Sequence, residues 1–124
     1  MNSMNRTIRA VALCALILAA CGGEETVELS PAAIEGRQIA GDLGCAACHG
    51  VDGQGGVGPA WVGLAGSEVE LADGSVVLAD TEYLRRSITD PEAEVVAGYT
   101  TKMPENTLSD DQVDAVVAYI EELR

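Results

Sequence analysis

Aromatic and basic side chains are both scarce in this chain of 124 residues. It contains no phenylalanine, one tryptophan and three tyrosines, an aromatic content of 3%. A chain of this length forms one small domain, and with so few rings its core needs apolar bulk from another source. Lysine and arginine total 7 against 20 aspartate and glutamate residues, a formal charge of −13. Because nucleic acids are bound through basic surfaces, this balance excludes a nucleic-acid-binding protein.

Long apolar runs and phosphate-binding signatures are also missing. The apolar stretch at residues 10–20 has eleven residues, whereas a membrane-spanning helix needs about 20. Residues 50–59 are rich in glycine, but they lack the G-x-x-x-x-G-K-[ST] pattern and have no lysine nearby. We therefore interpret them as a loop pressed closely against a neighbouring group, where side chains would not fit. The chain has no internal repeat.

The only histidine of the chain stands in the sequence Cys45-Ala46-Ala47-Cys48-His49, the C-x-x-C-H pattern of covalent c-type haem attachment. Residues i and i+3 share one helix face, so both thiols can reach the two vinyl groups along one haem edge. The next residue then places an imidazole under the iron as an axial ligand. The motif predicts one covalent haem c, which would supply the missing apolar bulk.

Two other uses of paired cysteines fit less well. A thioredoxin-like redox pair needs a βαβ context, and no such pattern surrounds Cys45. A structural zinc site needs four Cys or His ligands, but Cys14 and Cys21 fall in a segment that resembles an export signal.

The N-terminal segment has the layout of a secretory signal, with Arg6 and Arg9 ahead of the apolar stretch. Its end, residues 18–21 (LAAC), closely resembles the bacterial lipobox, in which the cysteine is lipidated and becomes the mature N-terminus. Cys21 is therefore predicted to carry a lipid anchor. Loss of residues 1–20 would leave 5 basic against 20 acidic residues, a formal charge of −15.

The remaining chain divides into a tether and a domain. Residues 21–29 comprise the lipidated cysteine and a small, acidic and flexible stretch. Residues 30–124 are expected to form one domain. The prediction for localisation is an exported protein, lipid-anchored to a bacterial membrane and facing the periplasm.

Start signals and periodicity predict the elements of this domain. Ser30-Pro31 begins a first helix, with an apolar stripe at Ala32, Gly36, Ile39, Ala40 and Leu43. Gly36 implies the close approach of another helix, because glycine otherwise costs about 1 kcal/mol there. Residues 69–78 predict a β-hairpin around Asp73-Gly74, and residues 81–89 a helix capped by Asp80.

The last helix begins at a capping box, residues 109–112 (SDDQ). Its apolar stripe is Val113, Val116, Val117, Ile120 and Leu123, with Tyr119 on the flank. Glu121 and Glu122 lie near the C-terminal end, where the helix dipole slightly disfavours them.

Met103 is the predicted distal axial ligand. It lies in a polar stretch without helical periodicity (residues 98–107), a poor place for a core methionine, and it is the only methionine left after the signal. With His49 as the sole histidine, ligation by two histidines within the chain is impossible. Arg85 and Arg86 are expected to be solvated charges, and pairing of one of them with a haem propionate is the alternative.

With these pieces in place, residues 36–123 resemble a class I cytochrome c. More narrowly they are similar to the cytochrome c domain of subunit II of some bacterial terminal oxidases. The matching pieces are GCAACHG, GVGPAWVGLAG, SEVELADGSVVLAD, EYLRRSITDP, VAGYTTKMP and LSDDQVDAVVAYIEEL. The resemblance implies an all-α fold of three to five helices around one covalent haem, with a small β-hairpin. An oxidase subunit II carries transmembrane helices and a copper site ahead of this domain, whereas a lipobox and a tether precede it here. We therefore expect a separate small lipoprotein.

The resemblance also assigns roles to four further positions. Pro59 would accept a hydrogen bond from His49 through its carbonyl, and Trp61 would line the haem pocket. Gly36 and Tyr119 match the positions where the first and last helices cross. The family commonly has a bulky aromatic after the Ile39 position, where this chain has Ala40.

These observations predict an electron carrier and not an enzyme: a membrane-anchored mono-haem cytochrome that transfers single electrons in a respiratory chain. The expected partners are redox proteins such as a terminal oxidase or a quinol-oxidising complex, and the protein is expected to be a monomer. The alternative is a haem c subunit permanently docked in an oxidase or dehydrogenase complex. A catalytic or gas-sensing haem protein needs an open iron position, which ligation by His49 and Met103 removes.

Overall fold

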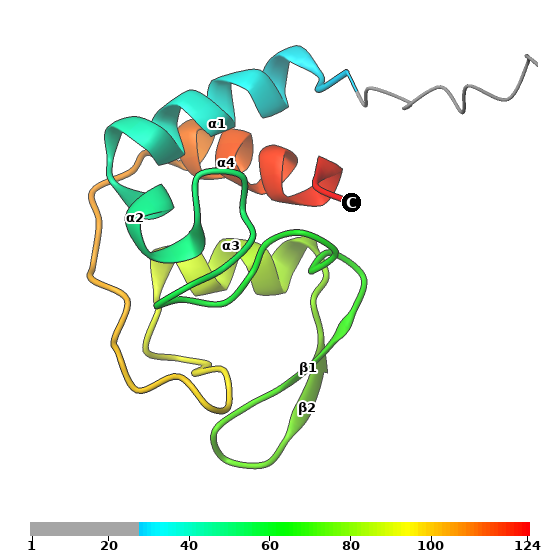
Figure 1. Ribbon diagram of the computed structural model, residues 1–124, viewed down its shortest axis with the longest axis vertical. Helices are drawn as coiled ribbons and strands as arrows, with labels where there is room; N and C mark the ends of the chain where they lie inside the picture. The colour runs from blue at the N-terminus through cyan, green and yellow to red at the C-terminus, as the bar shows by residue number, and fades with distance from the viewer. Residues whose placement is uncertain (1–27) are drawn as a thin grey trace, which may run out of the picture.

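The computed structural model describes residues 28–124, and the predicted signal, Cys21 and most of the tether lie outside this range. Four helices and one hairpin make up the domain (Figure 1). In chain order they are α1 (Pro31–Asp42), α2 (Cys45–His49), β1 (Glu68–Glu70), β2 (Val76–Leu78), α3 (Thr81–Thr89) and α4 (Asp110–Glu122). Within residues 28–124 no helix has both the length and the apolar character needed to cross a membrane. The predicted all-α fold with a small hairpin is confirmed.

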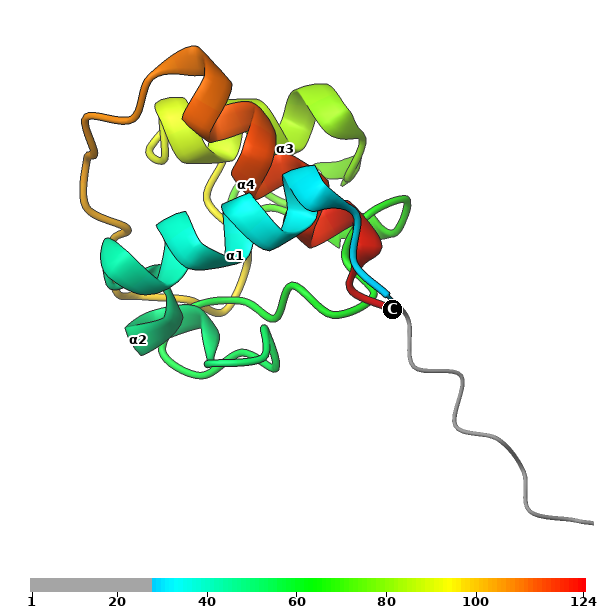
Figure 2. The ribbon, with the colours of Figure 1, turned by 90° about the horizontal axis from the view of Figure 1, so that it is seen from above.

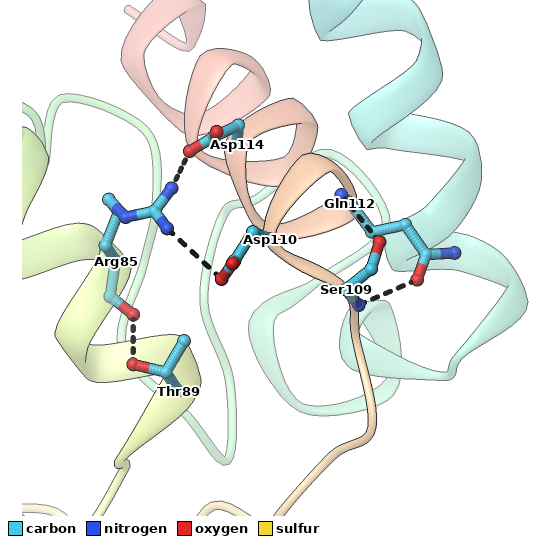
Figure 3. A network of polar contacts seen from close by, with 6 residues as sticks. All are labelled: Arg85, Thr89, Ser109, Asp110, Gln112 and Asp114. Carbon is cyan, nitrogen blue, oxygen red and sulfur yellow. Dashed lines mark hydrogen bonds and ion pairs between the residues drawn. The ribbon is translucent and has the colours of Figure 1, made fainter.

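Side-chain caps start the three longer helices where the sequence predicts them. Ser30 Oγ accepts a hydrogen bond from the backbone N–H of Ala33 at the start of α1. Asp80 caps α3 in the same way. Ser109 and Gln112 form the reciprocal capping box of α4, drawn in Figure 3. These contacts satisfy N–H groups that have no partner inside the helix.

Helices α1 and α4 cross at close range, and this crossing organises the core (Figure 2). Gly36 lies at the contact, where an added Cβ would stand 1.9 Å from the carbonyl oxygen of Ala115. The predicted close approach of another helix at Gly36 is therefore confirmed. Tyr119 is 3% exposed and lies within the core.

The predicted apolar stripe of α1 is wrong at two positions. Ala32 is exposed and Leu43 is 56% exposed, whereas Ala33 is fully buried. The reason is the rotation that the crossing imposes: bringing Gly36 against α4 turns its neighbours Ala33 and Ala40 inward. In α4 the predicted stripe is buried apart from Leu123, which is partly buried, and Ala115 is buried in addition.

The hairpin has the predicted turn and an antiparallel register that pairs Val69 with Val77. Asp73 stabilises the turn by accepting hydrogen bonds from the backbone and the hydroxyl of Ser75. Beyond β1, Leu71 pairs with Val96 as an isolated bridge. The hairpin therefore holds the chain that follows α3.

The last turn of α4 joins the starts of two other helices. Glu122 Oε2 accepts a hydrogen bond of 2.8 Å from the backbone N–H of Ser30, at the start of α1. Glu121 accepts one of 2.6 Å from the hydroxyl of Thr81, at the start of α3. Both carboxylates thus lie near helix N-termini, where negative charge is favourable. This offsets the unfavourable position at the end of their own helix.

Candidate functional site

The two cysteines of the motif lie on one turn of α2. Gly44, in the left-handed conformation with φ 75°, lets the chain turn sharply from α1 into α2. Cys45 and Cys48 are three residues apart on this helix, half-buried and free of any disulfide. Burial raises the pKa of the Cys45 thiol above its ordinary value, because desolvation disfavours the thiolate. Two free thiols therefore share one face of α2, as thioether attachment to one haem edge requires.

The imidazole of His49 is held by one hydrogen bond. Its Nδ1 lies 2.7 Å from the carbonyl oxygen of Pro59. Because a carbonyl can only accept, Nδ1 carries the hydrogen and donates it, which leaves the lone pair of Nε2 free to bind a metal. The contact between His49 and Pro59 that the resemblance predicts is present.

The glycine-rich loop packs directly on the motif. A Cβ added at Gly58 would lie 2.9 Å from the His49 ring, and one added at Gly56 would lie 3.2 Å from the Cys48 carbonyl. The N–H of Gly58 donates to that same carbonyl at 2.9 Å. The sequence predicts that these glycines pack closely against a neighbouring group. The structure shows that this neighbour is, at least in part, the motif itself.

Trp61 covers the other flank of the imidazole. The two rings are stacked, with centroids 4.6 Å apart and an interplanar angle of 17°. The Trp61 side chain is 7% exposed. Its neighbour Tyr119 meets it edge to face at 6.1 Å. The sequence shows that Trp61 is apolar and close to the motif, but no sequence signal indicates the stack on His49.

Met103 lies in the long connection between α3 and α4. This connection passes along the side of the molecule that carries α2, as the yellow and orange segment shows in Figures 1 and 2. Met103 is half-buried. Among residues 28–124 no hydrogen bond joins it to the cluster of Cys45, Cys48, His49, Pro59 and Trp61, which the structure brings together.

Several hydrogen bonds hold this connection against the rest of the domain. Near its start, backbone hydrogen bonds join Ala72 to Val95 and Ala97 to Glu70. Near its end, the side chain of Asn106 donates to the carbonyl of Ile88, the inner-face residue one position before the end of α3, at 2.7 Å. The Met103 segment is thus tied to the hairpin and to α3.

Both arginines of α3 have carboxylate partners. Arg85 reaches Asp110 at 3.6 Å and Asp114 at closer range, and so links α3 to the first turns of α4 (Figure 3). Arg86 pairs with Glu94 at 2.6 Å. These ion pairs differ from the expected solvated charges. They also mean that pairing with a propionate would compete with carboxylates of the chain.

The residues present fit a covalently bound haem. Two free thiols share a face, and the adjoining imidazole has Nε2 available. Leu43 and Val57 flank the motif and are 56% and 53% exposed, which leaves apolar surface that a bound group can cover.

A small all-α domain with a C-x-x-C-H helix and an oriented imidazole defines the class of c-type haem proteins. The Cytochrome c family model matches residues 33–124, and the chain therefore belongs to the cytochrome c family. No curated protein matches the chain. Membership implies one covalently bound haem c, for which Cys45, Cys48 and His49 form the attachment motif. Haem c supplies a one-electron couple between ferric and ferrous iron, so this protein is an electron carrier and not an enzyme.

Proposed function

We propose that this cytochrome c is an exported, lipid-anchored carrier of single electrons between a quinol-oxidising complex and a terminal oxidase or reductase. The observation that carries the proposal is the His49 imidazole, held at Nδ1 by Pro59 beside the two thiols of α2. This arrangement orients an axial ligand beside the thiols that attach the haem, as an electron-transfer haem requires.

Met103 is proposed as the second axial ligand. It is the only methionine after the predicted signal, and its segment is tied down on the side of the molecule that carries α2. A thioether ligand raises the potential relative to an imidazole and leaves the iron without an open position. This ligation supports a carrier over a catalytic or gas-sensing haem protein.

The optical spectrum of the purified protein tests this ligation. With Met103 bound, the ferric protein should show a weak charge-transfer band near the red end of the visible spectrum. Met103→Ala should abolish the band, and Met103→His should lower the midpoint potential because imidazole favours ferrous iron less than thioether does. Thr100→Ala, an exposed position in the same segment, serves as the control. An unchanged band and potential in Met103→Ala would refute the assignment.

The lipid anchor is supported by the sequence of residues 18–21 and by the place where the tether joins the domain. Ser30 begins α1 at the end remote from α2 (Figure 1). The tether of residues 21–29 would span at most about 30 Å when fully extended. An anchor at Cys21 would therefore leave the side of the haem motif free to meet a partner close to the membrane.

A terminal oxidase is the favoured electron acceptor because the domain resembles the cytochrome c domain of oxidase subunit II. The same resemblance favours, as the second candidate, a haem subunit docked permanently in such a complex. Copurification in mild detergent separates the two. A carrier should elute alone, whereas a fixed subunit should remain with the oxidase through a salt wash.

A further inference from the structure

A line of aromatic rings leads from His49 away from the motif. Trp61 stacks on the imidazole with a centroid separation of 4.6 Å, and Tyr119 meets the Trp61 ring at 6.1 Å. Both separations fall in the range of direct aromatic contact. The chain contains only four aromatic residues, and two of them stand in this line.

The far end of the line opens onto a cavity. Tyr119 lines an open cavity of about 220 Å³ together with side chains that include Arg37, Asp52 and Arg124. The Tyr119 residue is only 3% exposed, and its hydroxyl makes no hydrogen bond to any other described residue. Burial raises the pKa of this phenol, while Arg37 lowers it and Asp52 raises it further. Both charged groups therefore act on the phenol from the cavity walls.

We propose that Trp61 and Tyr119 form an electron route between His49 and this cavity, separate from the exposed edge of the haem. Electronic coupling falls steeply across gaps and less steeply through ring systems in contact, so the stacked imidazole and the edge-on phenol favour this path. In the haem-loaded protein one electron would pass from a reduced redox protein at the cavity to the iron, so that the donor is oxidised and the iron reduced by one electron. No bond forms or breaks and no proton moves. The rings act as a bridge and are not themselves oxidised.

The route gives the carrier two faces for electron exchange. The cavity extends from the start of α1, where Leu29 contributes to its wall, to Asp52 in the loop that follows the motif. This inference rests on the covalent haem of the family and does not depend on the lipid anchor or on Met103.

A photoactivated ruthenium complex attached to an introduced cysteine tests the route in the haem-loaded protein lacking Cys21. Cys45 and Cys48 are consumed by the haem and Cys14 is replaced by serine, so the introduced thiol is the only one available. Arg124→Cys places the label beside the cavity, and Ala72→Cys places it in the exposed hairpin turn as a control. The measurement is the rate of intramolecular electron transfer to the haem after a flash.

From the label at position 124, Trp61→Leu and Tyr119→Leu should each slow the transfer several-fold. Tyr119→Phe and Trp61→Phe keep a ring in place and should retain most of the rate. From the label at position 72 the two Tyr119 variants should leave the rate unchanged, while the Trp61 variants are compared with each other at each label position. The visible spectrum and midpoint potential of each variant establish that the haem is intact and allow comparison at equal driving force.

Two outcomes would overturn the proposal. An unchanged rate of electron transfer from position 124 in both leucine variants would show that the two rings do not mediate the transfer. An equal loss from both label positions would show that the substitutions disturb the haem and not a path. Should Trp61→Leu fail to fold, the pair of Tyr119→Leu and Tyr119→Phe still decides the question. The assignment of the protein as an electron carrier survives either result.

Discussion

At position 36 hydrogen is the only side chain that fits the backbone geometry. A Cβ there would meet the carbonyl oxygen, the carbonyl carbon and the next amide nitrogen of the facing helix, at 1.9, 2.5 and 2.9 Å. These are backbone atoms of Ala115 and Val116, which cannot rotate away as a flexible side chain could. The two helices would have to separate, and the core they share with Tyr119 would loosen.

Gly36→Ala should therefore destabilise the haem-loaded protein by about 1–3 kcal/mol, the usual cost of overpacking a core. Gly41→Ala is the matched control, because Gly41 is in the same helix and has nothing within 4 Å of an added Cβ. That control should stabilise the protein by about 0.5–1 kcal/mol, as alanine favours the helix. Denaturant unfolding measures both. Equal effects of the two substitutions would contradict a close crossing.

The orientation of His49 depends on one hydrogen bond and on close packing of the ring. Nδ1 donates to a backbone carbonyl and not to a carboxylate, so the imidazole gains orientation without a neighbouring full charge. Trp61 stacks on the ring, and Gly58 lies so close that an added Cβ would stand 2.9 Å from it. The ring is thereby held in place before any metal is bound.

At the scale of elements, the last turn of α4 connects three helices. Glu122 and Glu121 accept hydrogen bonds from Ser30 and Thr81, the residues at the starts of α1 and α3. The hydrogen bonds from Ser30 lower the pKa of the Glu122 carboxyl from its ordinary value of about 4.5. The ionised form of Glu122 is therefore favoured by folding.

The stability of the protein depends on pH because the pKa of Glu122 differs between the folded and unfolded states. A carboxyl whose pKa is lower in the folded state contributes stability above its unfolded pKa, and this contribution disappears as pH falls through the folded pKa. Glu122→Gln should therefore be less stable than wild type near neutral pH. The difference in free energy of unfolding between the two proteins should narrow as the pH falls below about 4.5. Urea unfolding at several pH values measures the gap.

Glu105→Gln is the control for this prediction, because Glu105 is exposed and accepts no hydrogen bond from any described residue. Its stability should follow that of wild type at every pH. A gap for Glu122→Gln that stays constant between pH 7 and pH 3 would show that the carboxylate charge is not what joins α4 to α1.

At the scale of the whole molecule, the main feature is a large net negative charge. Removal of the predicted signal leaves a formal charge of −15 before the haem propionates are counted. Three of the five remaining basic residues, Arg85, Arg86 and Lys102, already pair with carboxylates of the chain. The surface therefore cannot present the ring of basic side chains with which mitochondrial-type cytochromes c dock.

Electron transfer to a partner with a basic face should accordingly slow as salt is added, because screening acts over a Debye length of about 8 Å at physiological ionic strength. Polylysine should compete for the same acidic surface. Stopped-flow oxidation of the ferrous protein by the native oxidase measures both effects. Rates that stay flat from low to high salt would show that apolar contacts govern docking and that the acidity serves solubility alone.

The predicted lipid anchor also concerns the whole molecule. Cys21→Ser should block lipidation, leaving the protein unprocessed or released from the membrane. Haem attachment should survive, because Cys45 and Cys48 are separate thiols. Mass spectrometry of the membrane and soluble fractions measures the change. A Cys21→Ser protein of normal mature mass that stays membrane-bound after a salt wash would exclude the anchor.

Local features of the chain were sufficient to predict the helix starts, the hairpin turn and the haem motif. Each depends on neighbours in sequence: Ser30 and Ser109 cap within three residues, Asp73 within two, and Cys45 and Cys48 share one helix turn. Such contacts form wherever the local backbone is helical or turned, so their residue types reveal them.

The tertiary structure alone decided the contacts between distant segments. Which face of α1 is buried depended on a single close approach at Gly36, and so the predicted stripe failed at Ala32 and Leu43. The acidic end of α4 gained helix N-termini 40 and 92 residues away as partners. The stack of Trp61 on His49 likewise needs the loop between them to fold back. The sequence carries no periodic or spaced signal for such pairs, because their geometry exists only once the helices have packed.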